Sequence, residues 1–561
     1  MILIIVKIHF WGAAQVVTGS NFLLEIGDKK ILFDCGMFQG SRQLNRLNFK
    51  PFPYKPEEID LLILSHAHID HSGRIPSLIK AGFKGKIYST QATFDLCSIM
   101  LPDSGHIQEM ETEWDNRKRI RAGKSLRKPL YTVEEANDSL KYFSPVLYNQ
   151  KIALDDNLSI RFQDAGHILG SSIVELWIQE EGKNLKIVFS GDLGRKNKPI
   201  IRDPAIIEEA DYLILDSTYG HKFHPSLDNE AAKLIPIMIE TRKRGGNVVI
   251  PSFAIQRAQD IIYELNKYYD QIIAVRDKSY LDIPVYVDSP LAISATEIFR
   301  RNPDCFDQNT LALIKEGYNP LDFHNLHFSR TTKESKELNT SPESKVIISA
   351  NGMCTAGRIK HHLKHNLWRK ESSIVFVGYQ AEGTLGRRIK EGAKEVKIFG
   401  EEIGVNAQIH ALEGFSAHAD QAEIMQWLRN FKKRPKKIFL VHGEQEALAT
   451  LSDLIQQELN MDTIVPQIGD QFLLKGTEEA IPIEEREEKI KKEQQLFEEE
   501  TERLRELMTF VLEQIEQKSK EELPIEEVAK LRNKIMELRK EGLELSLLLT
   551  TKSNRNIEGK L

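Results

Sequence analysis

The sequence has little cysteine, no long apolar segment and no large excess of charge of either sign. Only four cysteines occur in 561 residues, and no two of them form a CxxC pair. This excludes a disulfide framework and a cysteine zinc ribbon, and it favours the reducing cytoplasm. No run approaches the roughly eighteen apolar residues that a membrane-spanning helix needs. The apolar residues 1–6 are too few for a signal peptide and predict a strand.

The net charge of −6 does not mark a strongly basic nucleic-acid binder. Local basic clusters nevertheless occur at Arg117–Lys128, Arg242–Arg244, Arg358–Lys370 and Arg429–Lys437. Two interpretations stay open for each cluster. It is either a solvated helix face or a patch that binds phosphate.

A hydrophobic content of 41% and a length of 561 residues predict three or four globular domains. Strands that alternate with loops and helices predict an α/β architecture. In the first part, short apolar strands end in polar or glycine-containing turns, as at FDCG, LSHAHIDH, FSGDLG and LDSTYG. These strands are expected at Asn21–Ile26, Lys30–Phe33, Asp60–Leu64, Lys86–Ser89, Leu185–Ser190 and Tyr212–Leu215.

After residue 215 the sequence pattern changes to strands that alternate with helices, and this alternation predicts a separate parallel sheet. We therefore expect residues 1–215 and 372–480 to form one domain, with residues 216–371 inserted into it. Ser373–Val377 and Lys436–Val441 are expected to be strands of the first domain. Residues 481–561 carry two apolar stripes at helical spacing on either side of Pro524, which predicts a helical or coiled-coil tail. The tail either packs on the body or serves as an arm that forms a homodimer or binds another partner.

The segment His66-Ala-His68-Ile-Asp70-His71 is the strongest chemical signal in the chain. Imidazole and carboxylate groups suit a divalent ion such as zinc, and four such groups lie within six residues at a strand end. Three further residues occur just past other strands, namely His167, Asp192 and His442. Because a carboxylate has two oxygens, Asp192 is the candidate to bridge two ions.

The ordered motifs FDCG, SHAHIDHSG, AGHILGS and SGDLG resemble the metallo-β-lactamase superfamily, and LDSTYG, GFSAHAD and FLVHGEQ resemble its β-CASP branch, which processes nucleic acids. Within that branch the chain resembles the bacterial homologues of the endonuclease subunit of the cleavage and polyadenylation specificity factor. The resemblance implies an αββα sandwich, an inserted parallel-sheet β-CASP domain and a C-terminal helical extension.

The resemblance also implies roles for individual residues. One zinc would be held by His66, His68, His167 and Asp192, and the other by Asp70, His71, Asp192 and His442, with Mn²⁺ as an alternative metal. Asp34 would orient the ligand loop. Asp216 would pair with His418, a general acid, so that Asp70, Asp216 and His418 are the catalytic candidates. A histidine at position 442 accompanies RNA-cleaving members of the family.

Two turns of the inserted segment are candidates for binding the phosphates of a substrate. Ser252 would lie at a strand-to-helix turn with free N–H groups, and Arg257 would lie one turn inside the helix. A second turn contains glycine before a helix. For both turns the alternative is that these residues only form the turn and bind no phosphate. The candidate residues of the second turn are Gly352, Arg358 and His362.

These observations predict a zinc-dependent ribonuclease that cleaves single-stranded RNA between the two domains. A small-molecule hydrolase fits the HxHxDH motif but needs neither the insertion nor Asp216 and His418. A DNA nuclease is disfavoured by His442, and a non-catalytic scaffold is disfavoured by the complete ligand set. The sequence leaves the choice between endonuclease and exonuclease action open.

Overall fold

The computed structural model describes residues 5–180, 183–225, 227–273, 283–378, 380–381 and 383–475, together with residues 509, 528, 531, 532, 534 and 535. The chain divides into two units, Met1–Glu479 and Ala480–Leu561. Most of the predicted tail helices therefore lie outside the described residues, and the homodimer stays a prediction. The six described residues of the second unit are helical.

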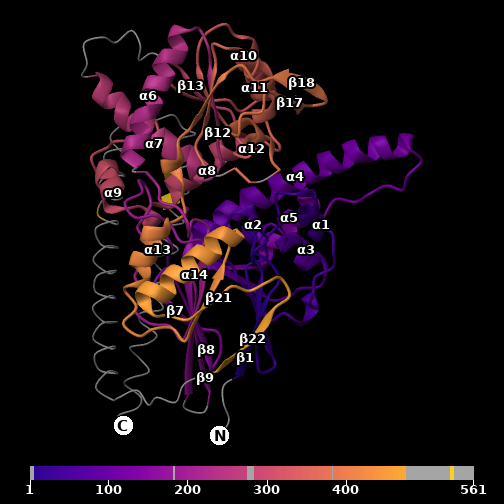
Figure 1. The fold of residues 1–561 in the computed structure, drawn as a ribbon, viewed down its shortest axis with the longest axis vertical. Coiled ribbons are helices and arrows are strands. Elements are labelled where there is room, and N and C mark those ends of the chain that lie inside the picture. Colours follow the sequence, from indigo (N-terminus) through magenta and orange to yellow (C-terminus); the bar gives the residue numbers. More distant parts are fainter. Residues whose placement is uncertain are drawn as a thin grey trace. The chain divides into compact units, whose positions relative to one another are not determined.

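Two seven-stranded sheets form the centre of the first domain (Figure 1). The first sheet has the order β22-β1-β2-β3-β4-β5-β6, and the second has the order β21-β20-β11-β10-β9-β8-β7. The first sheet contains β1 (Ile5–Phe10), β2 (Phe22–Ile26), β3 (Lys29–Phe33), β4 (Leu61–Ile63), β5 (Lys86–Thr90), β6 (Phe143–Val146) and β22 (Gln471–Lys475). The second contains β7 (Lys151–Ala153), β8 (Leu158–Asp164), β9 (Ser172–Glu180), β10 (Lys183–Phe189), β11 (Tyr212–Asp216), β20 (Lys437–Val441) and β21 (Thr463–Ile464).

Alternating apolar residues make these strands face one another across a buried core. Phe189 of the second sheet contacts Phe22 and Phe33 of the first, with ring centroids 5.5 and 5.2 Å apart. Phe10 continues this aromatic core, 5.2 Å from Phe439. The rings therefore join the two sheets into one sandwich.

Helices cover both outer faces, which completes the predicted αββα arrangement. Ile75 and Leu96 pack with Leu62 of the first sheet, whereas Trp427 and Leu448 pack in the core beneath the second. The helices of the first face are α1 (Arg42–Leu47), α2 (Ile69–Ser72), α3 (Ile75–Lys80), α4 (Gln91–Arg121) and α5 (Val133–Ser139). Those of the second face are α13 (Gln421–Leu428) and α14 (Gln445–Leu459).

The inserted domain has a six-stranded sheet of order β14-β13-β15-β12-β16-β19, and every pair in it is parallel, as predicted. It forms one group of elements at the top of Figure 1. Its strands are β12 (Val248–Pro251), β13 (Val285–Val287), β14 (Leu326–Phe328), β15 (Val346–Ser349), β16 (Ser373–Phe376) and β19 (Gln408–Ala411), with a hairpin of β17 (Glu395–Ile398) and β18 (Glu401–Gly404). Its helices are α6 (Leu227–Lys243), α7 (Arg257–Ile273), α8 (Pro290–Arg301), α9 (Gln308–Lys315), α10 (Thr332–Thr340), α11 (Ile359–Asn366) and α12 (Leu385–Lys390).

The assignment of Ser373–Val377 to the first domain was wrong. Strand β16 pairs with β12 and β19 in the inserted sheet, so the insertion continues through β19 rather than ending at residue 371. A fully buried parallel strand is apolar throughout in either domain, and its pattern therefore carries no information about which sheet it joins. The expected strand Lys436–Val441 is β20 of the first domain.

The four cysteines are all buried and unbridged. Among the helices that the structure describes, none is both long and apolar enough to cross a bilayer.

The aromatic core between the sheets yields a stability prediction. Replacing Phe189 with Ala should lower the free energy of unfolding by about 3–5 kcal/mol, because a cavity would open between the sheets. Replacing the exposed Phe223 with Ala should change it by less than about 0.5 kcal/mol. Chemical denaturation followed by circular dichroism measures both, and equal effects of the two variants would contradict this account.

Candidate metal centre

The predicted metal ligands converge from segments that end at one edge of the sandwich. His66 and His68 follow β4, and α2 carries Asp70 and His71. His167 lies between β8 and β9, whereas Asp192 and His442 follow β10 and β20. The sandwich therefore brings together seven side chains that span almost four hundred positions.

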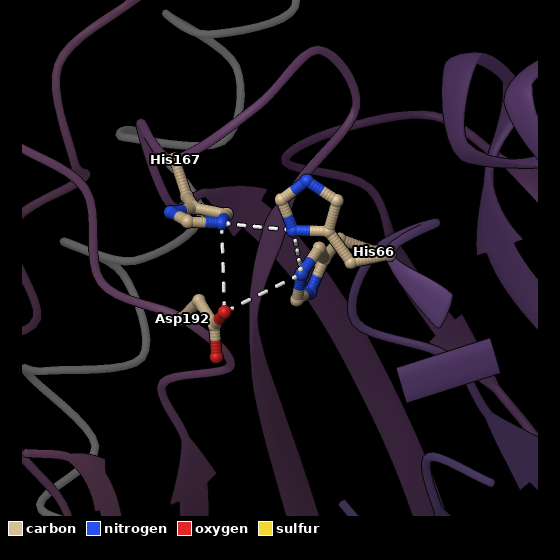
Figure 2. A group of neighbouring side chains, drawn as sticks. His66, His167 and Asp192 are labelled. Atoms are coloured by element: carbon tan, nitrogen blue, oxygen red, sulfur yellow. Dashed lines mark hydrogen bonds and ion pairs between the residues drawn. The ribbon is translucent and has the colours of Figure 1, made fainter. Parts of the chain in front are cut away.

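Four of these residues form a first donor group, consisting of His66, His68, His167 and Asp192. Figure 2 shows His66, His167 and Asp192 pointing toward one another. His68 Nδ1 lies 3.1 Å from His66 Nε2 and 3.2 Å from His167 Nε2. Asp192 Oδ2 lies 3.5 and 3.4 Å from the same two nitrogens. Three nitrogens and one oxygen thus surround a common point.

A second donor group faces the other oxygen of Asp192. Asp192 Oδ1 lies 3.1 Å from His71 Nε2 and 3.7 Å from His442 Nε2. His442 Nε2 is also 3.6 Å from Asp70 Oδ2 and 3.2 Å from His71 Nε2. Each carboxylate oxygen of Asp192 therefore faces one group, as a bridging ligand requires.

Burial sets the protonation of the first group. It lowers the pKa of His66 and His167 well below the usual value and that of His68 to about 4. These rings are consequently neutral near pH 7. Neutral imidazole is the form that binds a metal.

In the second group the neighbouring carboxylates raise the histidine pKa values more than burial lowers them. Burial alone would lower the pKa of His442, but Asp192, Asp216 and Asp70 raise it to about 10. The pKa of His71 is raised in the same way by Asp192 and Asp34. This part of the structure therefore concentrates negative charge that needs nearby cations.

The donor set fits a divalent metal. Apart from its approach to the histidine nitrogens of the second group, the buried Asp192 Oδ1 has no hydrogen-bond partner among the described residues. Buried polar atoms without partners are rare in folded proteins, and a bound ion is one species that satisfies them. Imidazole and carboxylate donors match zinc, and a bound ion would satisfy Asp192 Oδ1 and compensate the local charge.

Asp34 contacts the loop of residues 65–71, which the resemblance expects it to orient. Its Oδ2 lies 2.6 Å from His71 Nδ1, and its Oδ1 accepts a hydrogen bond from the backbone N–H of Ser65 at 2.8 Å. The tautomer with hydrogen on Nδ1 leaves Nε2 of His71 free to bind a metal.

His418 and Asp216 lie beside the centre and contact each other. His418 Nδ1 is 2.9 Å from Asp216 Oδ2, so the short aspartate side chain reaches the ring. His418 Nε2 faces the centre, 3.8 Å from Asp192 Oδ2. Asp420, two residues later, caps the start of helix α13 in a capping box with Glu423, which fixes the backbone beside His418.

The buried carboxylate of Asp216 remains ionised next to this histidine. Burial would raise its pKa, but His418 and His442 hold the pKa well below the usual range.

The structure places the Ser252 turn differently from the prediction. Ser252 is buried, its backbone N–H donates to Ser349 O at 3.0 Å, and its hydroxyl donates to Phe253 O at 3.0 Å. The expectation of a free N–H at this residue was wrong, because the strand pairing uses it. Arg257 is the first residue of α7 rather than one turn inside the helix. Arg257 and Gly352 stay predicted substrate contacts.

Arg358 and His362 surround a buried carboxylate instead of facing the centre. Arg358 Nη1 lies 2.5 Å from Asp288 Oδ1, and His362 Nε2 lies 2.6 Å from Asp288 Oδ2. The other ring nitrogen of His362 contacts Asn339 Oδ1 at 2.9 Å. Because His362 is fully buried with both nitrogens engaged, it cannot contact a substrate in this arrangement. Arg358 is also committed to this internal network.

Two residues that the sequence did not mark as functional complete the surroundings of the centre. Thr218 Oγ1 lies 2.9 Å from His442 Nδ1 and 2.7 Å from Asp216 Oδ1, so it links these two side chains. Because Thr218 lies only two residues after Asp216, the sequence could have identified it as a residue of the same site. Lys198 Nζ lies 3.1 Å from Asp260 Oδ2 of the inserted domain. No sequence pattern indicates that contact, because it joins two domains.

An αββα sandwich with a His/Asp cluster beyond its strand ends is the architecture of metal-binding hydrolases of the metallo-β-lactamase class. A metallo-beta-lactamase superfamily domain matches residues 23–211, and a Beta-Casp domain matches residues 258–389. A Zn-dependent metallo-hydrolase RNA specificity domain matches residues 402–466.

Similar proteins span most of the chain. Ribonuclease TTHA0252 of Thermus thermophilus is 36% identical over 445 residues, covering 79% of this chain and 95% of that protein. Transcription termination factor FttA of Methanocaldococcus jannaschii is 31% identical over 480 residues, covering 84% and 72%. FttA of Pyrococcus abyssi is 31% identical over 494 residues, with the same coverage. The chain therefore belongs to the β-CASP family of the metallo-β-lactamase superfamily.

The close approach between the FDCG loop and the ligand loop yields a prediction. A Cβ at Gly36 would lie 1.6 Å from the backbone oxygen of Asp70, so Gly36→Ala should displace the ligand loop. We expect reduced metal content and a loss of about 1–3 kcal/mol in stability. Gly404→Ala is the control, since its nearest atom would be 3.7 Å away. Metal analysis and thermal unfolding measure both; full metal content in Gly36→Ala would contradict the argument.

Proposed function

We propose that the chain is a zinc-dependent ribonuclease that hydrolyses phosphodiester bonds of single-stranded RNA at a binuclear centre. The orientation of Asp192 carries the proposal, because each of its oxygens faces a separate donor group. Zinc is the metal that the donor set favours, with Mn²⁺ as the alternative. Two bound ions would supply an activated water and neutralise charge on the phosphoryl oxygens.

The chain's own residues supply the proton that the leaving sugar oxygen needs. His418 Nε2 faces the centre, and its Nδ1 is held by Asp216. We assign His418 as the general acid and Asp216 as the residue that orients its ring. Asp70 is assigned to the second metal, where it lies on the side of His442.

RNA is favoured over DNA because His442 is the histidine that, by the resemblance, accompanies RNA-cleaving members of the family. A relative with 36% identity carries the name ribonuclease, which supports the same choice. DNA cleavage is the second candidate, because the donor groups themselves do not distinguish the two backbones. The cytoplasm is the proposed location.

The shared role of Asp192 predicts the metal stoichiometry. Wild-type protein purified with zinc should hold two ions, Asp192→Asn should lose both, and His167→Ala should lose chiefly one. His324→Ala, which changes an exposed histidine away from the centre, is the control and should keep both. Elemental mass spectrometry on the purified proteins measures this. A wild-type protein that binds a single ion in zinc excess would refute the binuclear centre.

The assignment of His418 predicts a selective loss of catalysis. His418→Gln should lower kcat for RNA by about 10²–10⁴ while the metal content stays unchanged.

Labelled single-stranded RNA and DNA of one sequence, each with and without a chelator, provide the substrates. His324→Ala again serves as the control. The ribonuclease proposal fails if no divalent ion supports RNA cleavage, and cleavage of DNA alone would establish the second candidate.

A further inference from the structure

The end of α4 and the segment after it form an arm that stands clear of both domains, at the right of Figure 1. We call residues 110–128 the basic arm. Helix α4 has 31 residues and is therefore about 46 Å long. The chain leaves the helix after Arg121 and turns back along it.

The charge of the basic arm is of one sign toward its tip. Residues 116–128 contain seven Lys or Arg and no Asp or Glu. Two of them form ion pairs, Arg117 with Glu113 and Arg127 with Asp115. The other five form no ion pair with a described carboxylate, and they are Lys118, Arg119, Arg121, Lys124 and Lys128.

Helix capping accounts for only part of this pattern. Basic residues in the last turn interact favourably with the carbonyl end of a helix. Lys124, Arg127 and Lys128, however, lie on the returning segment and outside the helix. Stabilisation of the helix end does not explain basic residues outside the helix, whereas binding of a polyanion does.

The basic arm also exposes large apolar side chains. Trp114, Ile120 and Leu126 are 62, 64 and 62% exposed, and the arm holds four of the fifteen exposed large hydrophobic residues of the described chain. Lys118 Nζ lies 3.1 Å from the centroid of the Trp114 ring. Aromatic rings beside cations are platforms on which single-stranded bases stack.

Hydrogen bonds hold the arm in shape without neutralising it. Asn116 Nδ2 donates to Arg127 O at 2.8 Å, and its Oδ1 accepts from the Arg127 N–H at 2.8 Å. Arg119 Nε donates to Ser125 O at 2.5 Å. The surface is thus preorganised, which reduces the entropy lost on binding.

Helix α4 connects this surface to the metal centre. At its start, the hydroxyls of Thr90 and Thr93 donate to Gly170 O at 2.7 and 2.8 Å. Gly170 lies three residues after His167, in the same loop. Helix α4 therefore links the arm to the loop that carries His167.

We propose that the basic arm is a second RNA-binding surface, which holds single-stranded RNA at a distance from the metal centre. The inference rests on the proposed ribonuclease function for the identity of the polyanion. It follows that a long RNA reaches both surfaces, whereas a short RNA bound at the centre does not reach the arm.

The test uses three charge-neutralising substitutions in the arm, Arg121→Gln, Lys124→Gln and Lys128→Gln, made together. Binding of long labelled RNA is measured by fluorescence anisotropy over a salt series, in the His418→Gln background to suppress cleavage. We expect at least about tenfold weaker binding and a salt slope smaller by about 2, since each phosphate contact to a single strand contributes about 0.7. With His418 intact, KM should rise for long RNA only and kcat should not change.

Matched variants separate charge, stacking and shape. Arg42→Gln, Lys84→Gln and Lys86→Gln together remove the same charge from exposed positions outside the arm and should leave binding unchanged. Trp114→Ala should weaken binding at least about fivefold through lost stacking, whereas Phe49→Ala, also at an exposed ring, should not. Asn116→Ala keeps the charge and should weaken binding by loosening the arm.

The outcomes distinguish this inference from the proposed function. If the arm variant binds long RNA as tightly as the charge-matched control, the inference is overturned even when the wild type cleaves RNA. A change of oligomeric mass in light scattering without a change in RNA binding would likewise overturn it, since the arm would then be a protein interface. Arm-dependent RNA binding by a wild-type protein that cleaves no RNA would uphold the arm and reject the ribonuclease.

Discussion

The structure around the centre depends on the burial of several carboxylates in a small volume. Asp34, Asp70, Asp192 and Asp216 all approach histidine nitrogens there. Burying unpaired charge is unfavourable by several kcal/mol or more per ion, so such a cluster is stable only with cations among its members. The neutral imidazoles of the first group cannot provide that charge, whereas divalent ions would do so for both groups. Metal binding and the stability of this edge of the sandwich are therefore coupled.

The inserted domain is held against the metal centre by polar contacts as well as by packing. Gln256 accepts a hydrogen bond from the Leu169 N–H at 3.0 Å, two residues after His167, and it donates to Asp260 at 2.8 Å. Lys198 of the first domain meets the same aspartate, and burial lowers the pKa of this lysine to about 8. Asn302 donates to Asp95 of α4 at 2.9 Å. The loop that carries the candidate ligand His167 thus contacts the inserted domain directly.

Local patterns predicted well those parts of the protein in which neighbouring residues act together. His66, His68, Asp70 and His71 are nearly contiguous, and so compact a set of histidines and aspartate at a strand end rarely occurs without a metal to bind. Strands bounded by polar turns, such as β3 and β4, were also predicted, because alternation and turn residues are local signals. Ser373–Val377 was assigned to the wrong sheet, since an apolar strand that is buried on both faces looks the same in either domain.

The sequence by itself determined the α/β class, the inserted parallel sheet and the kinds of atoms available for a metal. Those properties follow from residue chemistry and short-range periodicity. Only the tertiary structure decided that Asp192 presents one oxygen to each donor group, that Arg358 and His362 converge on Asp288, and that Thr218 links His442 to Asp216. Such contacts join residues up to several hundred positions apart, and their geometry depends on how the sheets and loops pack in space, which no local pattern encodes.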